Sequence, residues 1–319
     1  MTILATLFDT NYASRGYSML SSTGISADSW RVLALNGLED NVVGKLQAMG
    51  AGVLSEQELI ASNQKLLSGL RGRSRPEEIF TMGPSFLKEC MKESRDGEWV
   101  VYLDADLFFL AGVEEFIQTA GDSSVILVPH RHYPWNKGRL AKFGEYNVGL
   151  VAFRNDPVGR KALDFWSQSC IDWCKDSPED GKYADQKYLE AIARMGPRVH
   201  IAHEIGANLA PWNSDLHKIG RAGKGLVVDR APLYFFHAQG LKRLSGGWML
   251  GHLQYLSFAR NALVKHVYHP YFDSLKRSSD LLGVPVGGSA RQSDTFLGRV
   301  LTRLSLMVSG ALGQIVRDS

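Results

Sequence analysis

The hydrophobic positions of the chain fall into short continuous runs that alternate with amphipathic segments. The first run covers residues 2–8 and the second covers Trp30 to Leu35, and polar residues follow each of them. Such runs are typical of strands that are buried on both faces of a parallel sheet. The segments Arg15 to Ser22 and Asn41 to Met49 have the composition of helices. This βαβα order predicts an α/β fold with a mostly parallel central sheet and helices on both faces, in which ligands bind beyond the carboxyl ends of the strands.

The alternation of strand and helix patterns continues through the middle of the chain. Apolar runs bounded by turn residues predict three further strands, at Ser124 to Pro129, Asn147 to Phe153 and Leu233 to Phe236. Helical spacing of apolar residues, with a proline near the start of two segments, predicts helices at Pro84 to Lys92, from Asp156 to about Cys174 and at Tyr183 to Ala193.

The pattern changes near Gly251, where helical spacing with many Arg and Lys residues begins. The segment Phe296 to Val316 is amphipathic. We expect it to pack against the main domain or a second copy of the chain, as in a homodimer. Peripheral attachment to an anionic membrane is the less favoured alternative. The sequence thus predicts a main domain over residues 1–250 and a helical C-terminal extension over residues 251–319.

Composition narrows the range of functions. The 319 residues are 45% hydrophobic and 22% charged with a net charge of +3, which suits a globular protein and does not indicate a nucleic-acid binder. Three cysteines, Cys90, Cys170 and Cys174, form no disulfide framework, and we expect buried thiols in a reducing compartment. The first residues lack the features of a signal peptide, and no apolar stretch is long enough to span a bilayer. We therefore expect a cytoplasmic protein, with peripheral contact at the inner face of the membrane left open.

Two aspartates stand where a strongly apolar run ends. The run from Glu98 to Phe109 contains Asp104 and Asp106, separated only by Ala105. Unpaired carboxylates are costly inside a protein, so both are expected at the end of the strand, where they can bind a divalent metal. A turn or helix cap after the strand is the simpler interpretation, because aspartate is favoured in both places.

A third metal ligand is expected from a distant part of the chain. His237 follows an apolar strand, and an imidazole with two carboxylates suits Mn²⁺ better than Ca²⁺. Gly240 would let the backbone approach a phosphate, and Lys242 would supply a positive charge. A lone histidine after a strand is more often a hydrogen-bonded core residue, but the Gly-x-Lys that follows favours function.

Four short motifs occur along the chain in an order that is typical of one protein family. Asp104-Ala105-Asp106, the Asn147 to Leu150 segment, the Tyr183 to Leu189 segment and His237-x-x-Gly240-x-Lys242 follow one another along the chain. In this order they resemble the GT-A nucleotide-diphospho-sugar transferases, most of all the family-eight-type bacterial glycosyltransferases. The resemblance extends from roughly Thr6 to Lys242 and implies that residues 1–250 form a GT-A catalytic domain.

The resemblance implies a site for a nucleotide-sugar donor. Asp104, Asp106 and His237 would hold Mn²⁺, or Mg²⁺, against the donor diphosphate, with Lys242 sharing its charge. The loop after the first strand would contact the base, with Tyr12 stacking on it. Residues expected to touch the donor are Phe8, Asp9, Asn11, Tyr12, Arg75, Asp104, Ala105, Asp106, Asn147, Gly240 and Lys242. For Arg75 an exposed structural arginine is the favoured alternative, and for Asn147 a plain turn is an equal one.

The remaining motifs imply positions for the sugar and the acceptor. Asp185 and Gln186 would lie beneath the donor sugar as catalytic residues, although a helix-capping role for Asp185 competes with this, and Glu145 and Asp180 are alternative carboxylates. Trp212 and Asn213 would contact the acceptor. The basic and aromatic stretch 131–142 is either an acceptor rim suited to an anionic or lipid-linked glycan, or a solvated connection.

The expected activity is transfer of a hexose from a nucleotide-diphosphate donor, foremost a UDP-sugar, to a glycan or lipid-linked glycan in surface polysaccharide or lipopolysaccharide synthesis. Likeness to family eight favours retention of configuration, but Ala238-Gln239, the lack of a proline after Lys242 and the lack of a second acidic residue after Asp185 depart from that family. A non-catalytic sugar-nucleotide or glycan-binding protein is the alternative. A sugar-phosphate nucleotidyltransferase is disfavoured because no Gly- and Arg-rich loop follows the first strand.

Overall fold

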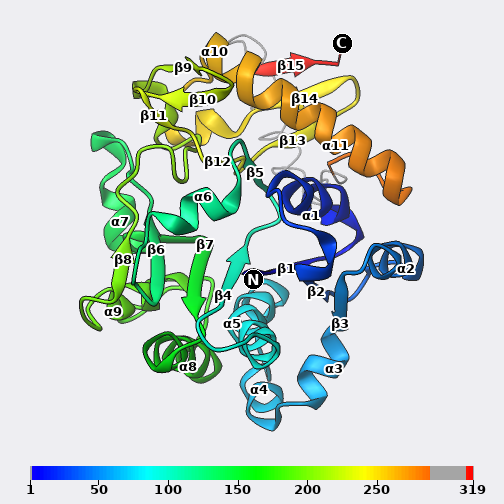
Figure 1. The fold of residues 1–319 in the computed structure, drawn as a ribbon, viewed down its shortest axis with the longest axis vertical. Helices are drawn as coiled ribbons and strands as arrows, with labels where there is room; N and C mark the ends of the chain where they lie inside the picture. The colour runs from blue at the N-terminus through cyan, green and yellow to red at the C-terminus, as the bar shows by residue number, and fades with distance from the viewer. Residues whose placement is uncertain (1, 288–313, 319) are drawn as a thin grey trace.

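Seven strands form the central sheet of the computed structural model, which describes residues 2–287 and 314–318 (Figure 1). The spatial order is β3-β2-β1-β4-β7-β6-β8. All neighbouring pairs are parallel except the two that involve β7. The mostly parallel α/β sheet predicted from the sequence is confirmed. Its strands are β1 (Thr2–Phe8), β2 (Trp30–Ala34), β3 (Gly52–Ser55), β4 (Trp99–Leu103), β6 (Val125–Pro129), β7 (Tyr146–Arg154) and β8 (Val199–Ile201).

Helices cover both faces of this sheet because alternate strand residues enter two separate cores. Leu4 and Val101 enter one core, and Ile3 and Val100 enter the other. The first core is closed by α1 (Thr10–Ser22), α2 (Asp40–Ala48) and α6 (Val113–Gln118). The second is closed by α3 (Glu56–Ala61), α4 (Gln64–Gly69), α5 (Arg75–Glu93), α8 (Pro157–Asp172) and α9 (Leu189–Ile192).

The strand β7 runs against its neighbours, and this reversal matters for the site. Its residue Leu150 lies opposite Leu103 at the carboxyl end of β4. The start of β7, at Tyr146 and Asn147, therefore reaches the same edge of the sheet at which β1 and β4 end.

Smaller sheets stand beyond the carboxyl edge of the central sheet, in the upper part of Figure 1. Here β5 (Leu107–Phe109) pairs with β12 (Phe235–His237), and a hairpin unit combines β9 (Ile219–Ala222), β10 (Gly225–Val228) and β11 (Ala231–Pro232). A third sheet contains β13 (Lys242–Leu244), β14 (Gly247–Met249) and β15 (Ile315–Arg317). The short helix α7 (Gly138–Phe143) lies in the connection that leads into β7.

The C-terminal part is helical only in part. After α10 (Asn261–Leu263) and a π-helical turn, Val264–Tyr268, the helix α11 (His269–Leu282) packs on α1, where Ser18 Oγ donates to Ser274 Oγ over 2.7 Å. Most of the predicted amphipathic segment Phe296 to Val316 lies outside the described residues. Its last two residues, Ile315 and Val316, belong to a strand rather than a helix, because β15 hydrogen-bonds to β14.

Two predicted helices have different limits. Helix α5 begins nine residues before Pro84, at a capping box in which Ser74 and Glu77 bond each other's backbone, so the proline of its first turn is Pro76. Pro84 lies inside the helix. The predicted helix from Tyr183 to Ala193 contains only a 3₁₀ turn, Gln186–Tyr188, and α9.

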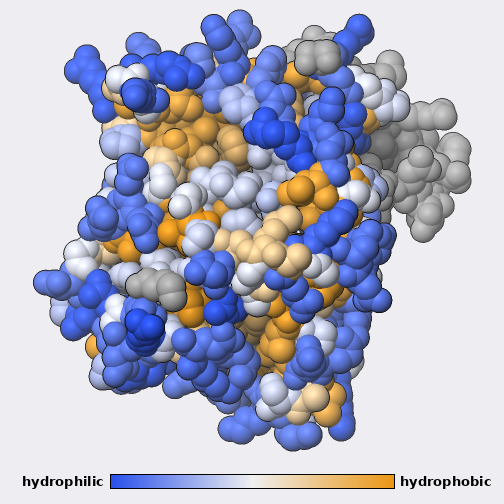
Figure 2. Space-filling view, turned by 45° about the vertical axis from the view of Figure 1, so that its right-hand side comes forward, coloured by the Kyte–Doolittle hydropathy of each residue, from blue (hydrophilic) through white to orange (hydrophobic). Residues whose placement is uncertain are grey.

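The three cysteines are buried and free, as the sequence predicted. Among the described residues, no helix combines the length and the hydrophobicity that crossing a membrane requires. Figure 2 shows one face of the molecule, on which apolar side chains gather across the upper and middle parts and polar side chains surround them.

Candidate functional site

Asp104, Asp106 and His237 come together at the carboxyl end of β4. The strand ends at Leu103, and a turn in which Leu107 N–H donates to Asp104 O sends both carboxylates to the edge of the sheet. The antiparallel pairing of β5 with β12 places Leu107 opposite His237. One ligand atom from each of the three side chains lies within 4.8 Å of the others. The structure thus brings together the three residues that the sequence predicted as metal ligands.

The imidazole of His237 is aimed at the carboxylates. Its Nε2 lies 3.0 Å from Oδ1 of Asp106 and 4.0 Å from Oδ2 of Asp104. The side chain is 1% exposed, and Nε2 makes no well-aligned hydrogen bond. A buried ring nitrogen facing two carboxylates without a hydrogen-bond partner is the arrangement that a divalent cation would complete.

Asn147 fixes which nitrogen of His237 faces the carboxylates. Its Oδ1 accepts a hydrogen bond from Gly149 N–H over 3.1 Å, which identifies this atom as the oxygen. The same Oδ1 lies 3.1 Å from Nδ1 of His237, so Nδ1 carries the proton and donates it. In the neutral ring Nε2 then has a free lone pair, which is the form that a metal ligand needs. A Cβ atom on Gly149 would lie 2.5 Å from Asn147 Oδ1 and 2.8 Å from the imidazole, so only glycine fits here.

Positive charge stabilises the group formed by Asp104, Asp106 and His237. Burial raises the pKa of Asp104 to about 6, with the charge of His237 opposing this rise and that of Asp106 adding to it. Burial alone would raise the pKa of Asp106 as well, but the charge of His237 outweighs it and lowers that pKa. Burial would lower the pKa of His237, and the two carboxylates reverse this and raise it. Without a metal the group holds a proton where a cation would otherwise stabilise both carboxylates.

Asp185 adds a further carboxyl group to the same interior. It is 8% exposed and stands at the start of the 3₁₀ turn Gln186–Tyr188, where its backbone oxygen accepts from Trp166 Nε1 over 2.8 Å. Burial and then the charge of Asp104 raise the pKa of Asp185 to about 8. Gln186 is held nearby, because its Nε2 donates to Phe143 O and its Oε1 accepts from Asn147 Nδ2. Their catalytic roles stay predictions.

The loop after β1 lies on the same side of the molecule. Asp9 caps α1 by accepting from Tyr12 N–H, and the ring of Tyr12 is 49% exposed. Partial burial and then the charge of Asp106 raise the pKa of the Tyr12 hydroxyl, so the ring reaches toward the metal group. Asn11 is exposed beside Asp9. The side chain of Phe8 is buried and packs against Gly16, so only its backbone is available to a base.

Gly240 and Lys242 occupy the loop between β12 and β13. Gly240 has a φ of 75°, and a Cβ atom there would lie 2.3 Å from Gln254, so the turn requires glycine. Lys242 is exposed and has no ion-pair partner within residues 2–287 and 314–318. The predicted contact of both residues with a diphosphate remains a prediction.

Sequence reasoning missed Arg15, a buried cation on α1. Its side chain is 5% exposed, and it donates to the backbone oxygens of Leu241 over 2.8 Å and of Gly287 over 3.1 Å. Its charge lowers the pKa of Asp106, and no carboxylate of the described chain lies within ion-pair distance of it. The only available signal was an arginine on the helix that follows the first strand.

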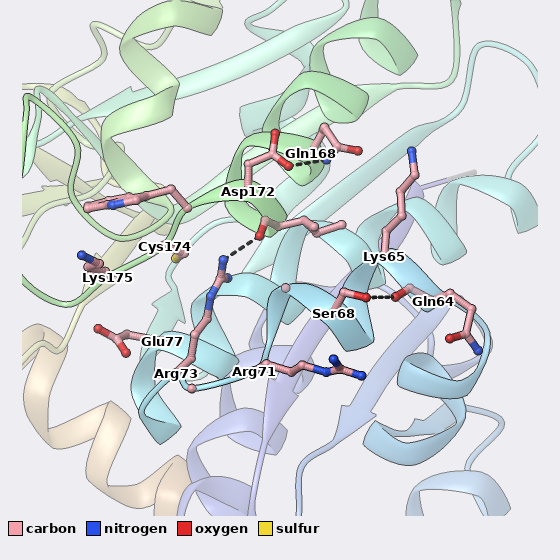
Figure 3. A pocket seen from close by; sticks show the side chains of 14 residues that line it. Gln64, Lys65, Ser68, Arg71, Arg73, Glu77, Gln168, Asp172, Cys174 and Lys175 are labelled. Atoms are coloured by element: carbon pink, nitrogen blue, oxygen red, sulfur yellow. Dashed lines mark hydrogen bonds between the residues drawn. The ribbon is translucent and has the colours of Figure 1, made fainter.

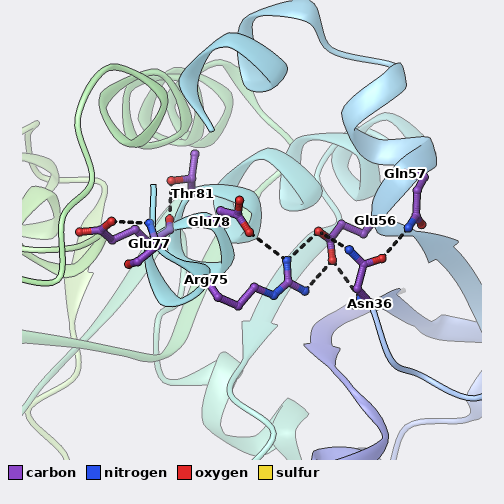
Figure 4. Close-up of polar contacts among 8 residues, drawn as sticks. Asn36, Glu56, Gln57, Arg75, Glu77, Glu78 and Thr81 are labelled. Atoms are coloured by element: carbon purple, nitrogen blue, oxygen red, sulfur yellow. Dashed lines mark hydrogen bonds and ion pairs between the residues drawn. The ribbon is translucent and has the colours of Figure 1, made fainter. Parts of the chain in front are cut away.

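Arg75 has a different environment from the predicted one. Figure 4 shows its guanidinium between Glu56 and Glu78. Both terminal nitrogens lie 2.7 Å from oxygens of the buried Glu56 carboxylate, which also accepts from Asn36. Two carboxylates already balance its charge, which favours the structural interpretation over a donor contact.

Trp212 and Asn213 lie behind the site rather than on its surface. The indole of Trp212 is 2% exposed, and its Nε1 donates to His130 O over 2.7 Å. The side-chain amide of Asn213 donates to the backbone oxygens of His130 and Asn208. Direct contact of either residue with an acceptor stays a prediction, and this burial weighs against it.

A separate hollow of about 950 Å³ lies between α4, the start of α5 and the end of α8 (Figure 3). Arg73 points into this region and donates to the backbone oxygens of Cys170 and Ile171 at the end of α8. None of Asp104, Asp106 and His237 lines it. It therefore belongs to the packing of these helices rather than to the metal group.

Comparison with known proteins yields two relatives with similar sequences, while no protein-family model matches. The Bacillus subtilis protein YfnD is 30% identical over 223 residues, which cover 68% of this chain and 70% of YfnD. YfnF of the same organism is 30% identical over 190 residues, which cover 57% of this chain and 63% of YfnF. Both are described as uncharacterized proteins.

Several solved structures are similar in fold. They include galactosyltransferase LgtC in complex with donor and acceptor sugar analogs, with 17% identity, 88% and 95% of the two chains covered and a TM-score of 0.47. GlyE of Streptococcus pneumoniae has 16% identity, 92% and 67% coverage and a TM-score of 0.47. Mouse xyloside xylosyltransferase 1 has 12% identity, 75% and 98% coverage and a TM-score of 0.45. At these levels of identity the similarity concerns the fold, and the chemistry of this chain depends on its own residues.

Proposed function

We propose a metal-dependent glycosyltransferase activity for this chain, which belongs to the same family as the uncharacterized Bacillus subtilis protein YfnD. One observation supports the proposal above all others. Asp104, Asp106 and His237 converge at the carboxyl end of β4, with Asn147 holding the imidazole so that Nε2 faces both carboxylates. Two carboxylates and a neutral imidazole suit Mn²⁺, or Mg²⁺ in its place.

The surroundings of this group suit a nucleotide-diphosphate sugar. The ring of Tyr12 offers a face to the base, and Lys242 and Arg15 add positive charge on either side of the loop that contains Leu241. A divalent ion bound by the three ligands would neutralise the diphosphate as its bond to the sugar breaks. Following the expectations from the sequence, we propose that UDP is the nucleotide of the donor and that the protein acts in the cytoplasm.

The proposed reaction exchanges one carbon–oxygen bond for another. The oxygen of an acceptor hydroxyl bonds to the anomeric carbon of the donor sugar, and the bond from that carbon to the diphosphate oxygen breaks. The electron pair leaves with the nucleoside diphosphate, and the acceptor proton passes to it or to water. Asp185, a buried carboxyl group whose pKa is raised by burial and by the charge of Asp104, would bind the sugar hydroxyls. Retention of configuration, a hexose as the sugar and a role in surface polysaccharide synthesis are parts of the same proposal.

A panel of donors tests the proposal. The purified protein is incubated with UDP-, GDP- and CMP-sugars, with Mn²⁺ or with a chelator, and released nucleotide is measured. We expect Mn²⁺-dependent release from one class of donor, foremost UDP-sugars. Tight binding of a donor without any turnover, with or without added glycans, would instead support the non-catalytic binding protein.

A further inference from the structure

Aromatic rings extend from the metal group into a region that the donor does not need. The ring centroid of Trp212 lies 5.2 Å from that of His237, and Trp212 in turn contacts Tyr255 at 5.6 Å and His132 at 6.0 Å. The ring of His130 stacks on His132 at 4.8 Å. We call His130, His132, Trp212 and Tyr255 the aromatic wall. Trp212 therefore links the imidazole of His237 to Tyr255 at the other end of the wall.

His132 leaves a polar atom without a partner in this wall. Its Nδ1 is buried and makes no hydrogen bond within the described chain. Burial and then the charge of Arg139 lower the pKa of His132 to about 4, so the ring is neutral near pH 7. His132 stacks with His130 at 4.8 Å and with Tyr255 at 6.3 Å, so the edge of the ring, rather than its faces, can meet a sugar and exchange a hydrogen bond with a hydroxyl.

Positive charge lines the outer side of the wall. The segment 131–142 contains no acidic residue. The guanidinium of Arg139 lies 4.9 Å from the centroid of Tyr255 and donates to Gln254 O over 3.3 Å. Neither Arg139, Lys137 nor Lys142 has a carboxylate partner among the residues that the structure describes. Unpaired guanidinium and ammonium groups beside a sugar site favour an anionic ligand, because charge-assisted hydrogen bonds are the strong ones.

Apolar side chains continue outward from the cations. Trp135 is 51% exposed and donates through Nε1 to the backbone oxygen of Tyr255 over 3.4 Å. Leu256 is 73% exposed and has a φ of 53°, in the left-handed region that a leucine rarely adopts. Phe258, two residues further on, is 43% exposed. Large apolar side chains exposed together mark a surface that binds an apolar partner.

We propose that the acceptor is a sugar joined through a phosphate or diphosphate to a lipid. The sugar ring lies against the outer edges of His132 and Tyr255, the phosphate meets Arg139, and the first part of the lipid chain lies on Trp135, Leu256 and Phe258. This inference rests on the proposed glycosyltransferase function, since the acceptor supplies the hydroxyl that attacks the donor sugar. Contacts through Tyr255 join the three chemistries, because His132 stacks with it, Arg139 lies over its ring and Trp135 donates to its backbone oxygen.

The test measures binding to the full chain saturated with Mn²⁺ and UDP. Three probes share one sugar: methyl N-acetylglucosaminide, N-acetylglucosamine 1-phosphate and geranyl-diphospho-N-acetylglucosamine. We expect the two anionic probes to bind at least about tenfold more tightly than the neutral one, and the lipid-linked probe to bind most tightly. Arg139→Gln should remove the advantage of the phosphate, and Leu256→Ser with Phe258→Ser should remove only the advantage of the lipid. Arg221→Gln, on the exposed strand β9, is the matched control and should change nothing.

Equal affinity for all three probes, or an unchanged preference in Arg139→Gln, overturns this inference. Preference for the free sugar phosphate over its lipid-linked form overturns the lipid part and identifies a soluble phosphorylated acceptor. Release of nucleotide with water as the acceptor is measured on the same protein preparations, with a UDP-sugar in place of UDP. If that release persists while the probes show no preference, only the acceptor inference fails. If no donor is turned over, the proposed function itself fails.

Discussion

The Nε2 atom of His237 lies 3.0 Å from Oδ1 of Asp106, although His237 belongs to strand β12 and Asp106 to the turn before β5. Charge on Asp106 is stabilised here by the imidazole and, further away, by Arg15. We expect Asp106→Asn to lose divalent-metal binding by more than the roughly 10- to 100-fold that is typical of outer-shell changes. Calorimetric titration with Mn²⁺ measures this, and nucleotide release should fall with it.

The control for this change is Asp122→Asn, which alters an exposed aspartate in a turn far from the ligands in sequence. It should keep both metal affinity and nucleotide release. Undiminished Mn²⁺ affinity in a folded Asp106→Asn protein would contradict the metal site.

Asn147 is expected to act on metal binding without touching the metal. Asn147→Leu removes the oxygen that accepts from Nδ1 of His237, so the ring is free to turn or to change its protonated nitrogen. Metal affinity should fall roughly 10- to 100-fold. Asn147→Asp keeps an accepting oxygen and should retain most of the affinity, whereas Asn41→Leu on the exposed side of α2 should have no effect. Equal affinities for the Leu and Asp variants would show that the hydrogen bond does not orient the ring.

Arg15 is expected to contribute to diphosphate binding. A buried cation without a carboxylate partner is costly, and an anionic ligand at the adjacent loop would compensate it. Arg15→Met should weaken UDP binding about tenfold or more and UMP binding much less, because only UDP carries the second phosphate. Arg15→Lys should recover part of the difference. Equal weakening for UDP and UMP would point to a purely structural role, and Arg95→Met, an exposed change, is the control.

The ion pair of Glu56 and Arg75 is expected to make stability depend on pH. Hydrogen bonds from Arg75 and Asn36 lower the pKa of Glu56 in the folded state. The stabilisation is therefore fully present above the pKa of the unfolded chain and is lost as pH falls through the folded-state value. Glu56→Gln should lower the free energy of unfolding by about 2 kcal/mol near pH 7 and flatten the acid side of the stability curve.

Urea unfolding measured from pH 7 downward tests this, with Glu114→Gln on the exposed side of α6 as the control. The control should stay within about 0.5 kcal/mol of the unchanged protein at each pH. A parallel shift of the whole curve in Glu56→Gln, with no change of slope, would show that the pKa of Glu56 is not depressed by folding.

Local patterns in the sequence were sufficient for β1, β2, β4, β6 and β7 and for the position of Asp104 and Asp106, but the short edge strands β3 and β8 were missed. The apolar run before them ends because charge cannot enter the core, and that physical reason holds wherever the rest of the chain goes. His237 was found by its motif, but its distance from Asp106 depends on the pairing of β5 with β12, which no local pattern specifies.

Other residues depended on three-dimensional packing. Trp212 was expected on the surface as a platform, but His130, His132, His237 and Tyr255 pack around it and leave it 2% exposed. Asn147 was expected to bind a sugar or form a turn, which stays a prediction, and its contact with His237 was not foreseen because it depends on β7 running against β4. Arg15 stands alone in the sequence, and its importance follows only from the distant backbone oxygens that it meets.

The reversed strand β7 also separates two parts of the site that can change independently of each other. Because β7 begins at the edge where β1 and β4 end, the segment 131–144 enters the site from outside the parallel part of the sheet. Insertions or substitutions in that segment can alter what is modified while the loops after β1 and β4 keep their shape. If the proposed function holds, this topology lets the acceptor side of the site change while the residues proposed to bind the donor keep their positions.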